Sequence, residues 1–230
     1  MTDEKKSLKT FDPIWDEIYE REEQLNRYPV DRIVSFVFRY RSRLALGGAL
    51  RVVEVGCGAC NNLWFAAREG CEVAGVDASA AAIKFGRERF AKDELDGDLR
   101  VGDFTQLPFA DESFDLAINR AALTQTGLNS AKKAVDEVAR VLRPGGLFYN
   151  EMFSTRTTAG GDPGADGVTL NVTGRLAGVG QICFYDEDRL DTLFANRWRI
   201  NALEHIETID YNASPRDVVG NWTVVAERAN

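Results

Sequence analysis

The residues best suited to chemistry are three acidic side chains, each associated with a short apolar stretch. Glu54 lies within the apolar run 51–55, which Gly56 and Gly58 follow directly. Asp77 ends a second apolar run, and Asp103 follows a third. Glycines let the backbone approach a ligand closely, and the start of a following helix favours a carboxylate or phosphate group. This arrangement predicts a site for a nucleotide-type ligand.

The second and third acids suit different parts of such a ligand. An acidic side chain at the end of a second strand can accept hydrogen bonds from both hydroxyls of a ribose, which is the role predicted for Asp77. Asp103 precedes Phe104, and a carboxylate beside an aromatic ring suits an adenine. The dinucleotide fingerprint requires a third glycine at position 61, where this chain has Asn61. The spacing therefore disfavours a dinucleotide.

Five motifs resemble, in their order and spacing, those of the class I S-adenosylmethionine-dependent methyltransferases. The resemblance covers roughly residues 50–152 and rests on VEVGCG at 53–58, VDAS at 76–79, GDF at 102–104, PFADESFDL at 108–116 and RVLRPGG at 140–146. The later segment that begins at Phe184 resembles the ending of small-molecule members of this family. The expected cofactor is therefore S-adenosylmethionine.

The resemblance also implies roles for the matching residues. The first motif would hold the methionine end of the cofactor, the second the ribose and the third the adenine, while two residues after the fourth strand would lie beside the transferred methyl group. The implied cofactor-binding residues are Glu54, Gly56, Cys57, Gly58, Asp77, Ala78, Asp103, Phe104, Asn119 and Arg120. Arg120 departs from the aromatic or Asp-Pro-Pro patterns that are commoner at its position, so the amine and nucleobase chemistry of those patterns is not carried over.

The predicted function is transfer of a methyl group to an oxygen or nitrogen of a small-molecule or sugar-linked acceptor. An acceptor that must lose a proton requires a base, and the candidates are Glu151, Tyr19 and Tyr185. A structural role is favoured for His205, the single histidine, because no partner for it is evident. Two alternatives stay open: an NAD-dependent oxidoreductase, and a non-catalytic module that binds the same cofactor. The candidates for contact with the acceptor are Trp15, Tyr28 and Arg156.

Composition narrows the partners. The net charge of −8 argues against a nucleic-acid partner, which would require a basic surface. No apolar run is long enough to span a bilayer, and residues 1–7 lack the apolar region of a signal peptide. We therefore expect a cytoplasmic protein that binds no membrane, either a monomer or a homodimer. Cys57 and Cys60 have the spacing of a redox pair or half a zinc site, but small residues in a tight turn are the favoured interpretation and no metal is expected.

The order of elements predicts how these residues are positioned. Strands alternate with helices between residues 50 and about 152, which predicts an α/β, doubly wound, mostly parallel sheet. The resemblance implies seven strands, the last of them antiparallel, in a Rossmann-like methyltransferase fold. Two preceding helices, the second over residues 31–46, would form an N-terminal helical cap at 1–49 on a single domain at 50–230. Residues 154–180 lack apolar periodicity and are expected to form a lid-like insertion.

Overall fold

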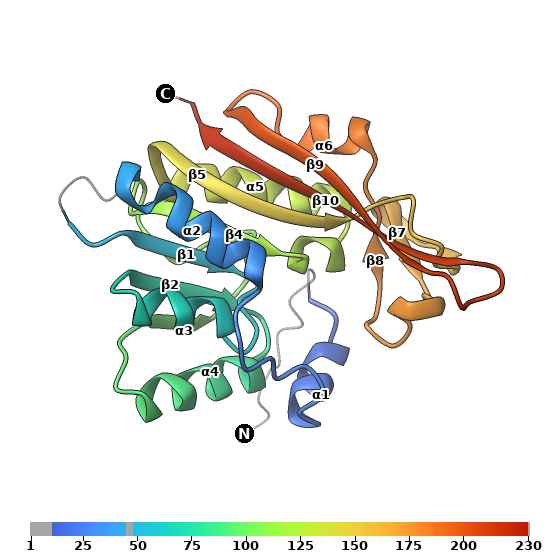
Figure 1. Ribbon diagram of the computed structural model, residues 1–230, viewed down its shortest axis with the longest axis horizontal. Coiled ribbons are helices and arrows are strands. Elements are labelled where there is room, and N and C mark those ends of the chain that lie inside the picture. Colours follow the sequence, from blue (N-terminus) through green and yellow to red (C-terminus); the bar gives the residue numbers. More distant parts are fainter. Residues whose placement is uncertain (1–10, 45–47, 230) are drawn as a thin grey trace, which may run out of the picture.

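The computed structural model describes residues 11–44 and 48–229 and confirms the predicted doubly wound, mostly parallel sheet. Seven strands lie in the order β3-β2-β1-β4-β5-β10-β9. Neighbours from β3 to β5 run parallel, and β10 is antiparallel to both β5 and β9 (Figure 1). The strands are β1 (Arg51–Val55), β2 (Glu72–Asp77), β3 (Asp98–Val101), β4 (Phe114–Arg120), β5 (Leu142–Phe153), β9 (Trp198–Asp210) and β10 (Asp217–Arg228).

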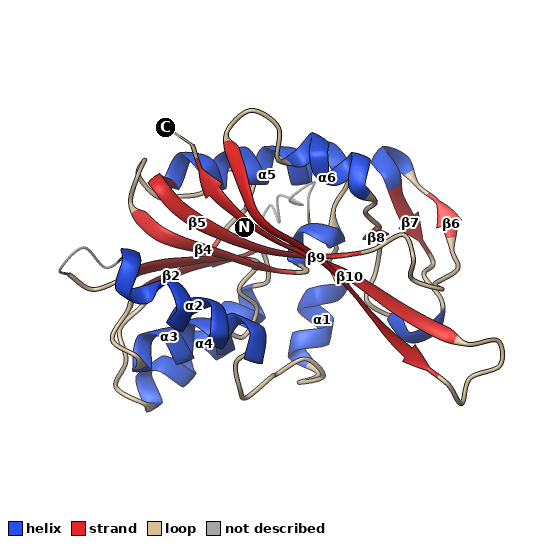
Figure 2. Cartoon of the chain, turned by 45° about the horizontal axis from the view of Figure 1, so that its top comes forward, coloured by secondary structure: helices blue, strands red, loops and turns tan. Residues whose placement is uncertain are grey.

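Helices cover both faces of this sheet. Figure 2 shows α5 and α6 on one side of the sheet and α2, α3 and α4 on the other. The bounds are α1 (Ile14–Glu20), α2 (Asp31–Leu44), α3 (Asn61–Arg68), α4 (Ala80–Lys92), α5 (Leu128–Val141) and α6 (Glu187–Leu193). The end predicted for the second helix, at residue 46, lies outside the described residues. None of the described helices has the length and apolarity needed to cross a bilayer.

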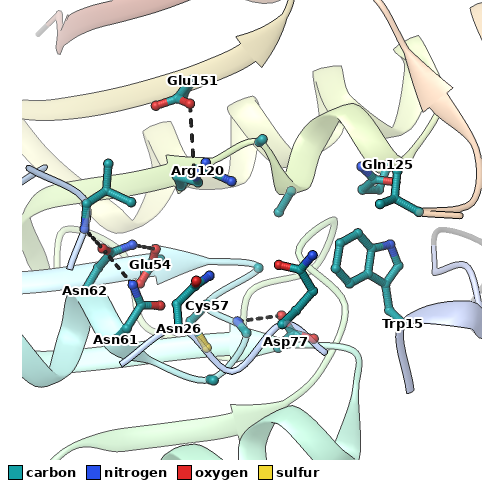
Figure 3. A pocket seen from close by; sticks show the side chains of 18 of the residues that line it. Trp15, Asn26, Glu54, Cys57, Asn61, Asn62, Asp77, Arg120, Gln125 and Glu151 are labelled. Atoms are coloured by element: carbon teal, nitrogen blue, oxygen red, sulfur yellow. Dashed lines mark hydrogen bonds and ion pairs between the residues drawn. The ribbon is translucent and has the colours of Figure 1, made fainter. Parts of the chain in front are cut away.

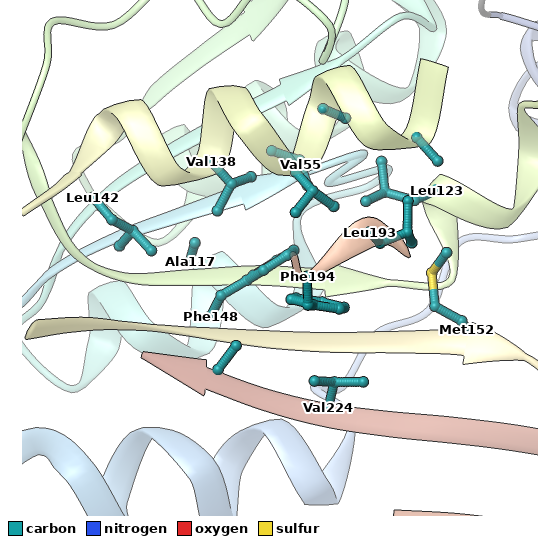
Figure 4. Close-up of a cluster of buried hydrophobic side chains, with 14 of the residues drawn as sticks. Val55, Ala117, Leu123, Val138, Leu142, Phe148, Met152, Leu193, Phe194 and Val224 are labelled. Carbon is teal, nitrogen blue, oxygen red and sulfur yellow. The ribbon is translucent and has the colours of Figure 1, made fainter. Parts of the chain in front are cut away.

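Alternating side chains of the central strands build two apolar layers. Val53 and Val55 face α5 and α6, together with Phe148 and Val224 (Figure 4). Val52 faces the opposite side, where buried side chains of α2, α3 and α4 pack. Because both faces of β1 are covered by helices, its sequence is almost uniformly apolar, as is usual for a central parallel strand. The exceptions are Arg51, at the start of the strand, and Glu54, which lies on the same face as Val52.

The strand order creates the place where a ligand fits. In an open parallel sheet, ligands bind beyond the carboxyl ends of the strands, at the point where the strand order reverses. Here that point lies between β1 and β4, because β1 pairs with β2 on one side and with β4 on the other. Gly56 follows β1 at this edge, and Ala121 follows β4. The predicted site residues therefore come from segments that the fold brings to one edge.

The segment expected to be a lid-like insertion has secondary structure of its own. Its apolar periodicity is missing because its strands are only two or three residues long. They form an antiparallel sheet in the order β6-β7-β8, beside the main sheet in Figure 1. The elements are β6 (Asp162–Pro163), β7 (Val168–Leu170) and β8 (Ile182–Cys183), with 3-10 turns η2 (Ala165–Gly167) and η3 (Gly174–Leu176).

The two N-terminal helices have different neighbours. Helix α2 packs into the apolar layer formed with α3 and α4 through Ile33, Phe36 and Val37. Helix α1 instead contacts α4, where the Asp16 carboxylate accepts a hydrogen bond of 2.5 Å from the Ser79 hydroxyl. Of the range predicted as an N-terminal cap, residues 1–10 and 45–47 lie outside the described residues.

Two of the motifs that carry the family resemblance are joined by a buried carboxylate. Asp115 Oδ1 accepts from Arg51 Nη2 at 3.0 Å and from Arg143 Nε at 2.6 Å, while Oδ2 accepts from the backbone N–H of Arg51 at 2.8 Å. Burial alone would raise the pKa of Asp115, but these hydrogen bonds hold that pKa below its usual value. Asp115 thus ties the start of β1 to the turn that enters β5.

We expect Asp115→Ala to lower the free energy of unfolding by about 2–4 kcal/mol, because it leaves two arginines without their shared partner. Urea denaturation at pH 7 measures the change. The Asp115 pKa is lower in the folded state, so its contribution is present above the unfolded pKa and is lost as the pH falls through the folded pKa. Asp98→Ala is the matched control, because the exposed Asp98–Arg100 pair should contribute at most about 1 kcal/mol. Equal effects of both substitutions would contradict this interpretation.

Candidate active site

The site is a cavity of about 680 Å³ beyond the carboxyl ends of the central strands. Its lining side chains include four carboxyl groups (Asp12, Glu54, Asp77 and Glu151) and two guanidinium groups (Arg120 and Arg175). Figure 3 shows four of them, Glu54, Asp77, Arg120 and Glu151, on different segments around the glycine turn. Among the described residues, no three His, Cys, Asp or Glu side chains are arranged to hold a metal ion. The excess of carboxyl groups favours a ligand that carries positive charge.

The glycine turn makes space for a ligand and uses its own N–H groups internally. Gly56 and Cys57 donate to the Val76 carbonyl at 2.7 and 3.1 Å, and Gly58 donates to Asp77 Oδ2 at 2.8 Å. These three N–H groups are therefore occupied within the protein. Gly56 has a φ of +66°, and a Cβ atom there would lie 2.1 Å from the Ala122 side chain. A side chain at Gly56 would collide with the segment that follows β4.

Glu54 is the most buried acid of the site. It is 2% exposed, and its Oε1 atom accepts a 2.7 Å hydrogen bond from Asn62 Nδ2. The Oε2 atom is also buried and has no hydrogen-bond partner among residues 11–44 and 48–229. Burial raises the Glu54 pKa to about 8, against the lowering effects of Asn62 and Arg120. A buried carboxylate oxygen without a partner is costly, so this atom is suited to a donor on a ligand.

Asp77 lies at the end of β2 and holds two segments together. Its Oδ2 atom accepts from the Gly58 N–H, and its Oδ1 atom accepts from the Ser79 N–H, each at 2.8 Å. Burial raises the Asp77 pKa to about 6, although these two backbone hydrogen bonds lower it. Each carboxylate oxygen can accept a further hydrogen bond. Asp77 and its neighbour Ala78 both line the cavity.

The wall opposite the glycine turn carries a glutamate next to an arginine. Arg120 Nε lies 3.8 Å from Glu151 Oε1, and the Tyr149 hydroxyl donates to Glu151 Oε2 at 3.1 Å. Glu151 is 9% exposed and lines the cavity together with Arg120. Asn119 does not line it: its side chain is fully buried and bonds to Asn150 and to the backbone of Leu123.

Helix α1 and the insertion form the remaining walls. Trp15 and Tyr19 of α1 line the cavity, and the Tyr19 hydroxyl lies over Gly58, within 2.2 Å of where a Cβ atom would be. Burial raises the Tyr19 pKa well above its usual value, with a further contribution from Asp77. Asp12 connects the two segments, because its Oδ2 atom accepts from the backbone N–H of Gln181 at 3.3 Å.

The loop between α1 and α2 is fixed to the start of α3. Asn61 Nδ2 donates to the Tyr28 carbonyl at 2.8 Å, and the Val30 N–H donates to Asn62 Oδ1 at 3.0 Å. Tyr28 lines the cavity, and its side chain is 76% exposed. Asn62 thus binds both Glu54 and this loop, a role that the sequence analysis missed. Its only local signal is its place two residues after the C-x-x-C turn.

Three further predicted site residues do not line the cavity. Tyr185 is fully buried in the apolar layer of α5 and α6, and its backbone forms an isolated parallel bridge with Ser154, just after β5. Arg156 is exposed and pairs with Glu187 and Glu207 at 3.8 and 3.7 Å. Asp103 Oδ1 accepts from the N–H and hydroxyl of Thr105, each at 2.7 Å, which directs it into its own turn.

The cavity also includes residues that the sequence analysis did not identify. Phe104 lines it as expected. Several of the additional residues lie on β5, on the insertion or on the last two strands, which no local motif marks. They are Phe153, Arg175, Leu176, Val179, Thr208, Val219 and Asn221, and Gln125 joins them from the 3-10 turn after β4.

Residues 53–150 match the family model described as a methyltransferase domain. The chain is similar to a demethylmenaquinone methyltransferase of Renibacterium salmoninarum, with 36% identity over 107 residues, or 46% of this chain and 43% of that protein. It is also similar to a phthiotriol/phenolphthiotriol dimycocerosates methyltransferase of Mycobacterium tuberculosis, with 34% identity over 117 residues, or 50% and 42% of the two chains. The chain therefore spans less than half the length of these relatives.

A solved structure supports the fold. The crystal structure of a SAM-dependent methyltransferase from Methanosarcina mazei covers 79% of this chain and 93% of its own length. The TM-score is 0.66 and the sequence identity is 21%. At this identity the similarity establishes the fold alone.

The raised pKa of Glu54 has a consequence for stability. The folded protein holds the Glu54 proton more tightly than the unfolded chain, so the contribution of Glu54 is complete below about pH 4.5 and is lost as the pH rises through 8. We expect Glu54→Gln, which cannot titrate, to gain stability relative to the parent protein by about 2–4 kcal/mol between pH 5 and pH 8. Urea denaturation at both pH values measures this difference.

The matched control is Glu72→Gln, which changes an exposed acid at the start of the neighbouring strand β2. Its stability relative to the parent protein should be the same at both pH values. A Glu54→Gln difference that does not change with pH would contradict the raised pKa.

Proposed function

We propose that this chain, which belongs to the class I S-adenosylmethionine-dependent methyltransferases, transfers a methyl group from that cofactor to an oxygen or nitrogen of a small-molecule or sugar-linked acceptor. The observation that carries the proposal is the Oε2 atom of Glu54, which no described residue bonds, in a cavity with an excess of carboxyl groups. When bound, S-adenosylmethionine supplies a methyl group on a positively charged sulfur, which a nucleophile can take directly.

The residues present fit this cofactor. Glu54 Oε2 would accept a hydrogen bond from the methionine ammonium group, which supplies the charge and the donors that this atom lacks. Asp77 would accept from the ribose hydroxyls while keeping its bonds to the turn. Ala78 and Phe104 offer apolar contact for the adenine. Gly56 and Gly58 would let the methionine end lie against the backbone.

Glu151 is the best-supported base of the three candidates. Tyr185 does not line the cavity, and the raised pKa of Tyr19 keeps its phenol protonated. Glu151 lines the wall opposite the glycine turn, where its carboxyl group accepts a hydrogen bond from the Tyr149 hydroxyl and lies beside Arg120. It would take the proton from an acceptor hydroxyl or ammonium group. Positioning supplies most of the remaining rate enhancement in a direct displacement.

The acceptor is bound, in this proposal, by the segments that surround the family-matched region. That region covers residues 53–150, whereas Trp15, Arg175 and Asn221 lie before or after it. Aromatic and polar side chains together suit a small molecule that carries a ring and hydroxyl or amino groups. The relatives named above act on a demethylmenaquinone and on phthiotriol lipids according to their names. Those acceptors are not transferred to this chain, because the acceptor walls lie outside the matched region.

Calorimetry tests the cofactor. We expect S-adenosylhomocysteine, the product that lacks the methyl group, to bind, and NAD to give no response. Asp77→Ala should weaken the binding of S-adenosylhomocysteine by about 1–3 kcal/mol, because the ribose hydroxyls lose their hydrogen-bond acceptor. Glu72→Ala, at the exposed end of the same strand, should leave the affinity unchanged. Binding of NAD without binding of the thioether would overturn the proposal.

A methyl-release assay over a panel of phenols, sugars, amino sugars and amines tests turnover. For an acceptor that is methylated, we expect Glu151→Gln to reduce the rate by at least about 100-fold, while the affinity for S-adenosylhomocysteine changes little. Glu187→Gln is the control, since Glu187 also pairs with an arginine but lies outside the cavity. Equal rates of parent and Glu151→Gln would remove Glu151 as the base. Cofactor binding without turnover on any acceptor would favour a non-catalytic module.

A further inference from the structure

The glycine turn contains two thiols that face each other. Cys57 Sγ and Cys60 Sγ lie 3.6 Å apart, and both cysteines are free and buried. Cys57 lines the cavity (Figure 3), whereas Cys60 lies behind it and is fully covered. The other two cysteines lie elsewhere in the fold: Cys71 precedes β2 and Cys183 ends β8. The turn is therefore the place in the described chain where a hydrogen bond joins two thiols.

The backbone already has the separation that a disulfide needs. The Cys60 N–H donates to the Cys57 carbonyl at 2.9 Å, which closes a β-turn. Such a turn keeps its first and last Cα atoms within about 7 Å, and disulfides span about 4.4–6.8 Å. A sulfur–sulfur bond of about 2.05 Å then requires small side-chain rotations and little backbone movement.

The conformation of Cys60 is a second and independent observation. Its φ is +58°, in the left-handed region that favours glycine. This conformation is unfavourable for a residue with a Cβ atom. The Cys60 side chain makes no capping hydrogen bond to α3 that would offset this cost. A strained, non-glycine residue at a ligand site is a reason to look for a function of its side chain.

We propose that Cys57 and Cys60 are a site of oxidative modification, at which a peroxide forms an intramolecular disulfide while the cofactor cavity is open. The Cys57 thiolate attacks one peroxide oxygen, and the O–O bond breaks to give a sulfenic acid and water. The Cys60 thiolate then attacks the Cys57 sulfur, the S–O bond breaks, and a second water leaves. In total, two thiols are oxidised, one hydrogen peroxide is reduced, and two waters form.

Access and charge set the conditions for this step. The Cys57 pKa lies above its usual value because of the hydrogen bond with Cys60, burial, and the nearby acids Asp77 and Glu54. The thiolate is the reactive form, so the reaction should accelerate as the pH rises above 7. A ligand bound over the turn would cover Cys57, and S-adenosylhomocysteine should therefore protect the pair.

Disulfide formation would disturb the cofactor site. Each sulfur now lies in a notch left by a glycine: a Cβ atom on Gly75 would meet Cys57 Sγ at 2.8 Å, and one on Gly86 would meet Cys60 Sγ at 2.6 Å. Drawing the sulfurs together removes at least one of them from its notch and changes the side-chain packing beneath the turn. The N–H of Gly58, which holds Asp77, lies between the two cysteines. We therefore expect weaker cofactor binding, an effect that rests on the proposed cofactor site, whereas the disulfide itself does not.

The test treats the full chain with hydrogen peroxide at pH 7 and pH 8.5 and then removes the excess. Intact mass should decrease by two hydrogen atoms, and peptide mapping should join Cys57 to Cys60. Calorimetry with S-adenosylhomocysteine should show affinity reduced by about tenfold or more, or about 1.4 kcal/mol, and dithiothreitol should restore it. S-Adenosylhomocysteine added before the peroxide should slow the change in mass.

Two variants separate the pair from general oxidation. Cys60→Gly, which suits the left-handed φ, and Cys60→Ala should both form no such disulfide. Cys71→Ala should respond to peroxide as the parent does. Absence of the Cys57–Cys60 linkage in the parent protein, or unchanged affinity after complete linkage, would overturn the proposal and leave packing as the role of the two thiols. If the reduced parent does not bind S-adenosylhomocysteine, the cofactor assignment fails while the mass measurement still decides the linkage.

Discussion

The burial of two carboxyl groups at the ends of β1 and β2 is the constraint on which this site depends. Glu54 is buried and Asp77 is half-buried at the point where the strand order reverses, and desolvation raises the pKa of both. A carboxyl group in this setting needs hydrogen-bond donors. Asn62 and the N–H groups of Gly58 and Ser79 supply them. Among the described residues no donor bonds the Oε2 atom of Glu54. A ligand that brings a hydrogen-bond donor to this atom would therefore suit the cavity.

The donors that serve these acids also organise the surrounding chain. Asn62 binds Glu54 through its amide nitrogen and the loop before α2 through its oxygen. Ser79 binds Asp77 through its backbone and α1 through its hydroxyl. Segments that are distant in sequence are thus joined to the acids by single polar side chains. The hydrogen bonds that serve Glu54 and Asp77 therefore also hold the segments that form the walls of the cavity.

The motifs that together carry the family resemblance have different physical roles in this structure. The glycine turn and the acid after β2 line the cavity, whereas Asp115 and Arg143 form a buried ion pair away from it. Arg140 likewise pairs with Glu137 and Asp111. The last motif that supports the family resemblance therefore holds the sheet together rather than contacting a ligand. An ordered set of motifs can identify a family even when only some of the motifs line the ligand cavity.

Local sequence determined the elements and the floor of the site. Apolar runs, helix periodicity and the glycine turn are properties of neighbouring residues, so they predicted the central strands and brought Glu54 and Asp77 to one edge. Tertiary structure alone decided that Tyr185 enters the core, because that outcome depends on packing against distant segments. Asp103 turns into its own loop through local hydrogen bonds from Thr105, which its motif did not reveal. Tertiary structure also decided that Glu151 faces the cavity beside Arg120, and that Cys60 lies against Cys57 in a left-handed conformation. Side-chain direction at the end of a strand or in a turn is set by the backbone angles of the folded chain, which residue type and spacing do not fix.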